Sequence, residues 1–356
     1  MNSFGSHTTE PPSLEDVLAA AVVFRVPLAV PFRGVTARTG ILLSGPAGWG
    51  EFSPFDDYSP QLAARWLASA LESAYVGWPA PLRSSVRVNG IIPALDAHRA
   101  AELARRLTTE SGMTTVKVKV AGSADRDHTG GEHTEGDVER LAAVRQAVGP
   151  DVAIRIDANG RWSAAKAIDL LPELAQAAGG IEYVEQPVAD LRDLAHVRRE
   201  TGLEVAVDES LRLAYDLSDP ALHEAIRASA DVVVAKVGPL GGVRRTLDVV
   251  SAIGLPTVVS GAMDTAVGLS AGVAAAASLP VEPRDCGLGT GALLAEDVVT
   301  EPWQACDGRL SVMSITPDPR ALERAQEQVP AGVQRRWLHR LQIAWKAGAP
   351  QLLGWS

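Results

Sequence analysis

The sequence predicts an α/β fold, a modified (β/α)8 barrel with an N-terminal α+β capping domain and a C-terminal extension. Short runs of β-branched residues alternate with helix-like segments, and charged residues end several of these runs. Three of the charges are Asp157, Glu185 and Asp208, and Lys236 follows them. The spacings are 28 residues from 157 to 185, 23 from 185 to 208 and 28 from 208 to 236. Each spacing accommodates a strand, a helix and two loops, which is the crossover that parallel strands require.

The first 84 residues do not share this spacing, so we assign residues 1–84 to the capping domain. Alternating apolar runs bounded by Pro and Gly predict antiparallel strands at Ala21–Val26, Gly40–Leu43 and Trp49–Phe52. Helical periodicity predicts a helix over Pro60–Ala74, with Ser59 as its N-cap and Pro60 at its first position.

Residues 85–310 are assigned to the barrel. Its eight predicted strands are Val86–Ile92, Thr115–Val120, Val152–Ile156, Ile181–Val184, Glu204–Val207, Asp231–Ala235, Pro256–Val259 and Asp285–Leu288, of which the last has the weakest pattern. Residues 311–356 form the C-terminal extension, in which we predict one helix at Arg320–Gln328 and a tryptophan-bearing tail that packs back on the body.

The composition narrows the classes of partner. The formal net charge is −10 and no dense basic run is present, which argues against a nucleic-acid partner. The sequence contains no run of about 20 apolar residues that would predict a membrane span, and residues 1–12 lack the pattern of a signal peptide. Only Cys286 and Cys306 are present, too few for a disulfide scaffold, so we expect a cytoplasmic protein. The sequence leaves the oligomeric state open.

The strand ends predict a metal site. In a barrel of parallel strands the C-terminal ends meet at one mouth, where such enzymes carry their chemistry. Asp157, Glu185 and Asp208 would converge there. Three carboxylates are suited to a hard divalent cation, so we predict Mg²⁺, with Mn²⁺ as the alternative ion.

Lysines add proton-transfer chemistry to this site. Lys117 and Lys119 share one face of the second predicted strand, and Lys236 ends the sixth, which lies opposite in an eight-stranded barrel. A metal-bound carboxylate substrate would have an acidified proton on its α-carbon, and a lysine could remove it. Each residue taken alone could equally be a helix cap or a solvated side chain. Their convergence predicts an enzyme acting on a small carboxylate.

These motifs resemble the enolase superfamily, in its muconate lactonizing enzyme subgroup. The resemblance rests on Lys117-Val-Lys119, Asp157-Ala-Asn159, Glu185-Gln-Pro187, Asp208-Glu-Ser210 and Lys236, and on the capping segment Gly48–Phe52. It implies Mg²⁺ on the three carboxylates, Lys119 as acid and base, and Lys236 across from it. Lys117, Asn159 and Glu209 would support them.

Two segments separate the subgroups. Val259–Asp264 contains no histidine, which disfavours the mandelate racemase and glucarate dehydratase types. Cys286–Thr290 lacks the Asp-x-Asp pattern of dipeptide epimerases.

Within the remaining subgroup, the chain resembles the o-succinylbenzoate synthases. The segments that carry this resemblance are Pro31–Gly40, Gly50–Tyr58, Ser260-Gly261 and Gly287–Leu293. It implies dehydration of 2-succinyl-6-hydroxy-2,4-cyclohexadiene-1-carboxylate to o-succinylbenzoate in menaquinone biosynthesis, through a metal-stabilised enediolate. Ser260, Gly261 and Arg38 are the candidate substrate-binding residues. Racemization of N-acylamino acids, muconate-type cycloisomerization and a non-catalytic carboxylate-binding barrel stay open as alternatives.

Overall fold

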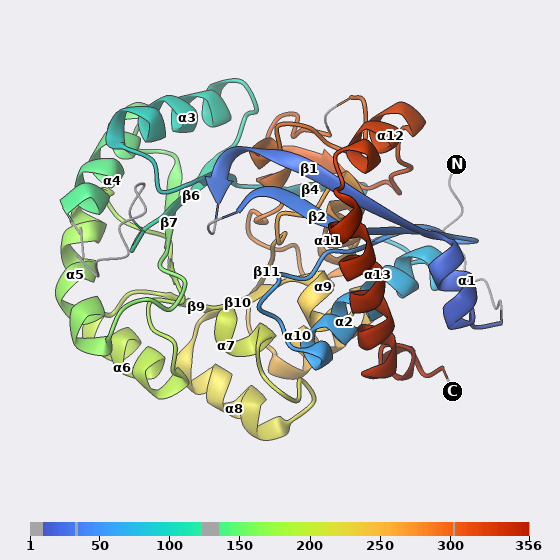
Figure 1. The fold of residues 1–356 in the computed structure, drawn as a ribbon. Coiled ribbons are helices and arrows are strands. Elements are labelled where there is room, and N and C mark those ends of the chain that lie inside the picture. The colour runs from blue at the N-terminus through green and yellow to red at the C-terminus, as the bar shows by residue number, and fades with distance from the viewer. Residues whose placement is uncertain (1–9, 33–34, 123–134, 302, 356) are drawn as a thin grey trace.

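The computed structural model describes residues 10–32, 35–122, 135–301 and 303–355. Its centre is a curled sheet of seven parallel strands in sequence order: β5 Gly90–Ile92, β6 Thr115–Lys119, β7 Ala153–Asp157, β8 Val184–Glu185, β9 Val205–Val207, β10 Val232–Ala235 and β11 Thr257–Val259. Helices cover its outer side: α3 Ala97–Thr109, α4 Glu135–Val148, α5 Ala164–Ala177, α6 Leu191–Thr201, α8 Pro220–Ser229, α10 Val243–Ile253 and α11 Ala266–Ser278. In Figure 1, α3 to α6 and α8 form an arc around the strands. The predicted barrel fold is confirmed.

The strand register aligns the charged strand ends. Lys119 is the partner of Asp157 across the β6–β7 pair, and Asp157 is the partner of Glu185 across β7–β8. Glu185 in turn is the partner of Ala206 on β9, two residues before Asp208. Because all these strands are parallel, the charged residues form a row along the carboxyl edge of the sheet.

Two strand predictions at the barrel seam are wrong in detail. The first predicted strand divides into β4 Ser85–Arg87 and β5, because the chain changes partners: β4 pairs with β12 Arg309–Ser311, and β5 pairs with β6. The eighth predicted strand, Asp285–Leu288, forms only single bridges, Val88 with Cys286 and Ser260 with Gly287. These bridges link the two sides of the seam without a regular strand.

The capping part begins with α1 Leu14–Ala19 and an antiparallel sheet of β1 Ala21–Phe32, β2 Val35–Gly45 and β3 Gly48–Phe52. The helix α2 Pro60–Leu71 follows, with Ser59 Oγ accepting from the Leu62 N–H at 3.3 Å, and continues as the π-helical turn η1 Glu72–Val76. The predicted helix therefore changes its hydrogen bonding after Leu71. A Cβ on Gly50 would lie 2.0 Å from the Ala70 carbonyl oxygen, so β3 crosses α2 at a distance that requires glycine.

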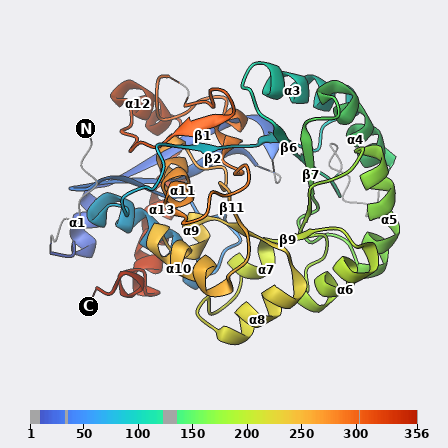
Figure 2. The same cartoon turned by 180° about the vertical axis from the view of Figure 1, so that it is seen from behind.

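The C-terminal extension is more helical than predicted. It contains α12 Pro319–Glu327, α13 Ala331–Lys346 and the short turn η3 Gln351–Leu353. The prediction of a single helix is therefore wrong. In α13, Trp337, Leu341 and Ala344 recur at the spacing of a buried helical face, which explains why this segment is helical. The rings of Trp337 and Phe52 meet edge to face at 5.9 Å, so α13 completes the core of the capping part. Helix α13 lies against α2 and β1, away from the arc of barrel helices (Figures 1 and 2).

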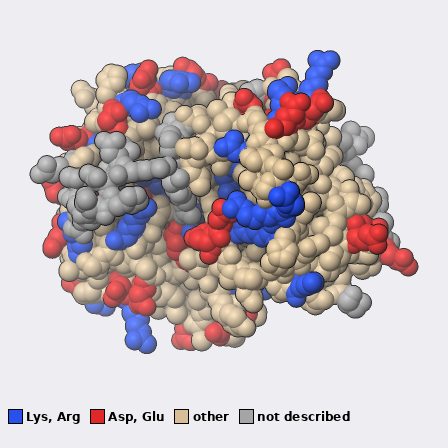
Figure 3. Space-filling model, in the orientation of Figure 1, with Lys and Arg blue, Asp and Glu red and all other residues tan. Residues whose placement is uncertain are grey.

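Short elements line the carboxyl edge of the sheet. These are α7 Glu209–Arg212, α9 Val237–Leu240 and the 3₁₀ turn η2 Gly289–Leu293. In Figure 3, Lys and Arg side chains gather near the middle of the face beside acidic side chains, and the other charges lie mostly toward its edges. Among the described residues, no helix combines the length and the apolar character that crossing a bilayer requires.

Candidate active site

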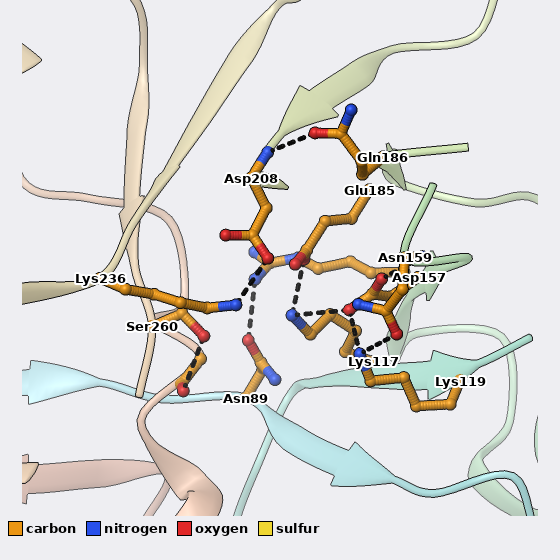
Figure 4. Close-up of polar contacts among 12 residues, drawn as sticks. Asn89, Lys117, Lys119, Asp157, Asn159, Glu185, Gln186, Asp208, Lys236 and Ser260 are labelled. Atoms are coloured by element: carbon orange, nitrogen blue, oxygen red, sulfur yellow. Dashed lines mark hydrogen bonds and ion pairs between the residues drawn. The ribbon is translucent and has the colours of Figure 1, made fainter. Parts of the chain in front are cut away.

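Three buried carboxylates form the centre of the site. Asp157 and Glu185 are the last residues of β7 and β8, and Asp208 follows β9 at the start of α7. None of the three residues is more than 1% exposed. Strand alternation turns all three side chains toward the mouth, as predicted, and Figure 4 shows them converging.

Lysines approach the carboxylates from two sides (Figure 4). Lys117 Nζ lies 2.6 Å from Glu185 Oε2 and 3.6 Å from Asp157 Oδ2. Lys119 Nζ contacts Asp157 Oδ2 and donates to Asn159 Oδ1 at 2.9 Å. On the other side, Lys236 Nζ donates to Asp208 Oδ2 at 2.6 Å.

The carboxylates differ in their electrostatic surroundings. Burial by itself would raise the pKa of Asp157, but the ammoniums of Lys119 and Lys117 outweigh it and hold that pKa below its ordinary value. Burial would also raise the pKa of Asp208, but the positive charges of Lys236 and Arg212 outweigh burial and lower that pKa. At Glu185, burial and the neighbouring Asp157 carboxylate raise the pKa to about 7. A cation added to this site would relieve the repulsion that Glu185 experiences.

The donor set fits a hard divalent cation. Within the described ranges, no three His, Cys, Asp or Glu side chains are gathered as a ready metal shell, since lysine ammoniums lie between the carboxylates. Glu185 Oε1, however, is buried and has no hydrogen-bond partner. An ionised oxygen in this position is costly unless a cation or a donor reaches it. Carboxylate oxygens on three adjacent strand ends match the preference of Mg²⁺.

A pocket opens beside these groups. Lys117, Lys119, Asp157 and Lys236 line it from the barrel, and Phe55 and Tyr58 line it from the segment between β3 and α2. The rings of Phe55 and Tyr58 meet edge to face at 5.7 Å. A ligand here would therefore contact charged groups on one side and an aromatic surface on the other.

The three predicted substrate-binding residues border this pocket or support its wall. Ser260 Oγ donates to the Gly287 carbonyl oxygen at 3.2 Å, and the Gly261 N–H donates to the same oxygen at 2.9 Å. Arg38 is 4% exposed and donates from Nε to the Met263 carbonyl oxygen at 3.0 Å. Their substrate contacts stay predictions, as do Arg33 and Gly34 of the segment Pro31–Gly40, which lie outside the described residues.

The two supporting polar residues form a link. Asn159 receives the Lys119 hydrogen bond and donates from Nδ2 to Glu209 Oε1 at 3.2 Å. Glu209 Oε1 also accepts from Arg212 Nη2 at 2.6 Å. Both residues therefore lie in contact with the charged centre.

Sequence reasoning missed three residues at this site. Gln186 Oε1 accepts from the backbone N–H groups of Asp208 and Ser210, at 2.9 and 3.2 Å, and so fixes the start of α7. Arg212 donates from Nε to Asp208 Oδ1 at 3.0 Å, and its position four residues after Asp208 was an available signal. Thr290 Oγ1 is buried beside the pocket with no hydrogen-bond partner, a feature with no local sequence signal.

Family models match most of the chain. The family described as "Enolase C-terminal domain-like" matches residues 99–318, and "Enolase N-terminal domain-like" matches residues 23–74. The first match contains β6 to β11 with all three carboxylates, and the second contains β2, β3 and all but the first two residues of β1.

Curated relatives match over nearly their whole length. The o-succinylbenzoate synthase of Thermobifida fusca is 45% identical over 91% of this chain and 96% of that protein. Those of Mycolicibacterium smegmatis and Mycobacterium tuberculosis are 43% and 42% identical, over 93% and 95% of this chain and 96% and 98% of the relatives.

Solved structures share the fold. Muconate lactonizing enzyme from Pseudomonas putida aligns with a TM-score of 0.69 at 19% identity, covering 86% of this chain and 98% of that one. The L-Ala-D/L-Glu epimerase from Bacillus subtilis aligns with a TM-score of 0.66 at 21% identity, covering 83% and 96%. Together with the curated relatives and the family models, these matches show that the chain belongs to the o-succinylbenzoate synthase family of the enolase superfamily.

Proposed function

We propose that this protein catalyses the Mg²⁺-dependent dehydration of 2-succinyl-6-hydroxy-2,4-cyclohexadiene-1-carboxylate to o-succinylbenzoate, a step of menaquinone biosynthesis. The observation that carries the proposal is the pair of lysines, Lys119 and Lys236, on two sides of three buried carboxylates. The names of the curated relatives select this substrate among those that such a site could accept.

The carboxylates and the metal have a defined task in this proposal. Asp157, Glu185 and Asp208 would hold Mg²⁺, and the unpartnered Glu185 Oε1 supports that assignment. When bound, Mg²⁺ supplies Lewis-acid stabilisation of the negative charge that develops on the substrate carboxylate. Lys117, buried between Asp157 and Glu185, would keep these two carboxylates apart and oriented.

Lys119 moves the proton. As the neutral amine, its Nζ takes the proton from the ring carbon that bears the carboxylate, and the electrons of the C–H bond pass toward that carboxylate. The resulting ammonium gives this proton to the departing ring hydroxyl, the C–O bond breaks, and the electron pair forms the last ring double bond as water leaves and the ring becomes aromatic. Asn159 Oδ1, 2.9 Å from Nζ, orients Lys119 for both transfers.

Lys236 stabilises the other side of the ring. Its ammonium would lie over the opposite face, where a cation interacts favourably with the anion and then with the aromatic product. Ser260, Gly261 and Arg38 would position the substrate carboxylates from the loop after β11 and from β2.

The presence of a lysine on each side supports one second candidate, racemization of N-acylamino acids. A racemase must exchange a proton on both faces of its substrate, whereas the dehydration needs one acid and base. Lys236→Arg therefore separates the two functions. We expect it to abolish racemization and to leave partial dehydration. Racemization is followed by the decrease in optical rotation of an N-acylamino acid, and dehydration by the decrease in absorbance of the substrate diene.

The domain division of residues 1–84, 85–310 and 311–356 is also a proposal, supported by the change from antiparallel to parallel strands. A small carboxylate substrate and a cytoplasmic location belong with it, the latter supported by the two free cysteines.

Direct assay tests the function. The purified protein is incubated with the cyclohexadiene substrate and, separately, with N-succinyl amino acids, before and after treatment with EDTA. We expect dehydration that chelation abolishes and that added Mg²⁺ restores. Racemization without dehydration, or full activity after exhaustive chelation, would overturn the proposal.

A further inference from the structure

Arg212 joins the metal-site carboxylates to the capping segment. It ends α7 and is 4% exposed. Nε donates to Asp208 Oδ1 at 3.0 Å, Nη2 donates to Glu209 Oε1 at 2.6 Å, and Nη1 donates to the hydroxyl of Tyr58. Three different groups therefore use the three nitrogens of one guanidinium, whose planar fork fixes their relative positions.

Tyr58 belongs to the aromatic wall of the pocket. It lies directly before Ser59, the N-cap of α2, and is 154 residues from Arg212 along the chain. Its ring contacts Phe55 at 5.7 Å and Trp66 at 6.4 Å, both edge to face. Tyr58, Phe55 and Arg212 line the same pocket as Lys119 and Lys236. The hydroxyl of Tyr58 thus connects this aromatic wall to the charged centre.

Arg212 also restricts Asp208. Asp208 Oδ1 accepts from Arg212, and Oδ2 is the oxygen that Lys236 reaches at 2.6 Å. Because Arg212 holds Oδ1 of Asp208, Oδ2 is the oxygen that can release Lys236 and bind a cation instead. From Glu209 the network continues through Asn159 to Lys119, so the same guanidinium has hydrogen-bonded links toward both sides of the site.

We propose that Arg212 is a positioning residue that couples metal holding to recognition of the substrate ring: it orients Asp208 for the cation and fixes Tyr58 as a specificity-determining wall against the ring. The ring and the cation both rest on the proposed function, but the cation part is tested by Mg²⁺ binding alone, without turnover. The substitution Arg212→Lys would keep the positive charge. It would remove the planar guanidinium that sets the relative positions of the three acceptors.

The first test measures Mg²⁺ binding by calorimetry without substrate. Groups that orient a metal ligand typically contribute 10- to 100-fold in affinity. We expect Arg212→Lys to weaken Mg²⁺ binding about tenfold, even though the charge is kept. If charge alone mattered, lysine would rescue binding, and wild-type Mg²⁺ affinity in Arg212→Lys would overturn the proposal. Thermal unfolding of each variant checks that the fold is retained.

The second test uses Tyr58→Phe, which removes a single oxygen and keeps the ring. We expect KM for the cyclohexadiene substrate to rise about fivefold, with kcat within about twofold of wild type, because the wall loses its fixed position while Lys119 stays in place. The matched control is Tyr215→Phe, the same change at a residue that is 92% exposed, and it should leave both constants unchanged. A KM for Tyr58→Phe equal to that of the control would overturn the proposal.

The double variant tests the coupling itself. If Tyr58 and Arg212 act through their shared hydrogen bond, adding Tyr58→Phe to Arg212→Lys changes KM by less than about twofold. Independent, multiplying effects would overturn the coupling. If Arg212→Lys does not fold, the comparison of Tyr58→Phe with Tyr215→Phe decides. If wild-type protein binds Mg²⁺ but does not dehydrate the substrate, the proposed function fails, and the calorimetric comparison still decides the role of Arg212.

Discussion

Two sets of buried carboxylates among the described residues are held in different ways. In the site, Asp157, Glu185 and Asp208 are approached by lysine ammoniums. At the contact between capping sheet and barrel, Glu51 on β3 accepts from protein groups that belong to the start of α11. Its Oε2 accepts from the Thr265 N–H at 3.0 Å, the Thr265 hydroxyl at 2.5 Å and the Gly268 N–H at 3.1 Å.

The difference lies in whether the partners can leave. Backbone N–H groups at the start of α11 cannot withdraw from Glu51 without disrupting that helix. A lysine ammonium ends a flexible four-carbon stem and can move aside for a cation. Burial raises the pKa of Glu51 to about 8 and that of Glu185 to about 7, with a neighbouring aspartate adding to each, so pKa alone does not distinguish the groups. The partners do: backbone N–H groups of α11 hold Glu51, whereas lysine side chains hold the site carboxylates, and in the proposed function these lysines give way to the cation.

The largest expected effect is in the exchangeable group. Lys119→Ala should lower kcat for dehydration about 10³-fold, since a positioned acid and base contributes about 10²- to 10⁴-fold. The chain should stay folded, as judged by its unfolding temperature. Lys346→Ala, at an exposed position of α13, is the control and should retain wild-type kcat. A loss of less than about tenfold in Lys119→Ala would remove this lysine from the chemistry.

The fixed contact should respond to pH in stability. Because folding raises the pKa of Glu51 from an ordinary value of 4.5 to about 8, the folded state keeps a proton that the unfolded chain loses. This contribution is complete below about pH 4.5 and is lost as pH rises to about 8. Its slope is about 1.4 kcal/mol per pH unit.

Glu51→Gln should abolish that slope. Relative to wild type, we expect the variant to gain about 3 kcal/mol of unfolding free energy between about pH 5 and pH 8, measured by urea denaturation. Glu323→Gln, an exposed change on α12, should follow the wild-type curve. Parallel curves for Glu51→Gln and wild type would show that the contact is ionised throughout.

Glu185→Gln sharpens the comparison from the other side. It removes a charge that burial and Asp157 disfavour, which offsets the loss of its ion pair with Lys117, so the unfolding temperature should change little. It also removes a proposed ligand, and we expect Mg²⁺ affinity to drop about 100-fold by calorimetry, with dehydration falling accordingly. A marked loss of stability with unchanged Mg²⁺ affinity would place Glu185 with Glu51, as a structural group.

The smallest expected effect concerns Thr290. Its buried hydroxyl has no hydrogen-bond partner and borders the pocket, so we expect it to bind a polar group of the substrate. Thr290→Val keeps the shape and should raise KM about tenfold, whereas Thr290→Ser should stay close to wild type. Equal KM values for the two variants would show that the hydroxyl contributes no binding.

The regular part of the fold could be predicted from the sequence because each βα unit repeats the same local pattern. The seam could not be. Val86–Ile92 reads as one apolar run, yet its two halves pair with partners that lie far apart in the chain, β12 and β6. Strand patterns show alternation and burial but not the identity of the neighbour. Helix α13 was missed because its buried face packs on the distant capping core.

The site divides in the same way. Asp157, Glu185 and Asp208 could be predicted because each ends a recognisable apolar run. Arg212 lies on a helix of four residues, too short to show periodicity, and its contact with Tyr58 spans 154 residues. The orphan oxygen of Thr290 depends on which neighbours fail to reach it, and no local pattern encodes that.

The position of α13 has a consequence for synthesis of the chain. Arg340 on this helix donates to the Pro54 carbonyl oxygen at 2.9 Å and also contacts the Phe55 carbonyl, so it supports the aromatic wall from behind. The turn η1 ends at Val76 and α13 begins at Ala331, about 255 residues later in the chain. At about 5 to 20 residues per second, the capping core waits on the ribosome for roughly 13 to 51 seconds before its last helix exists. Until then the face that α13 covers is exposed, so we expect the emerging N-terminal sheet to need protection by chaperones.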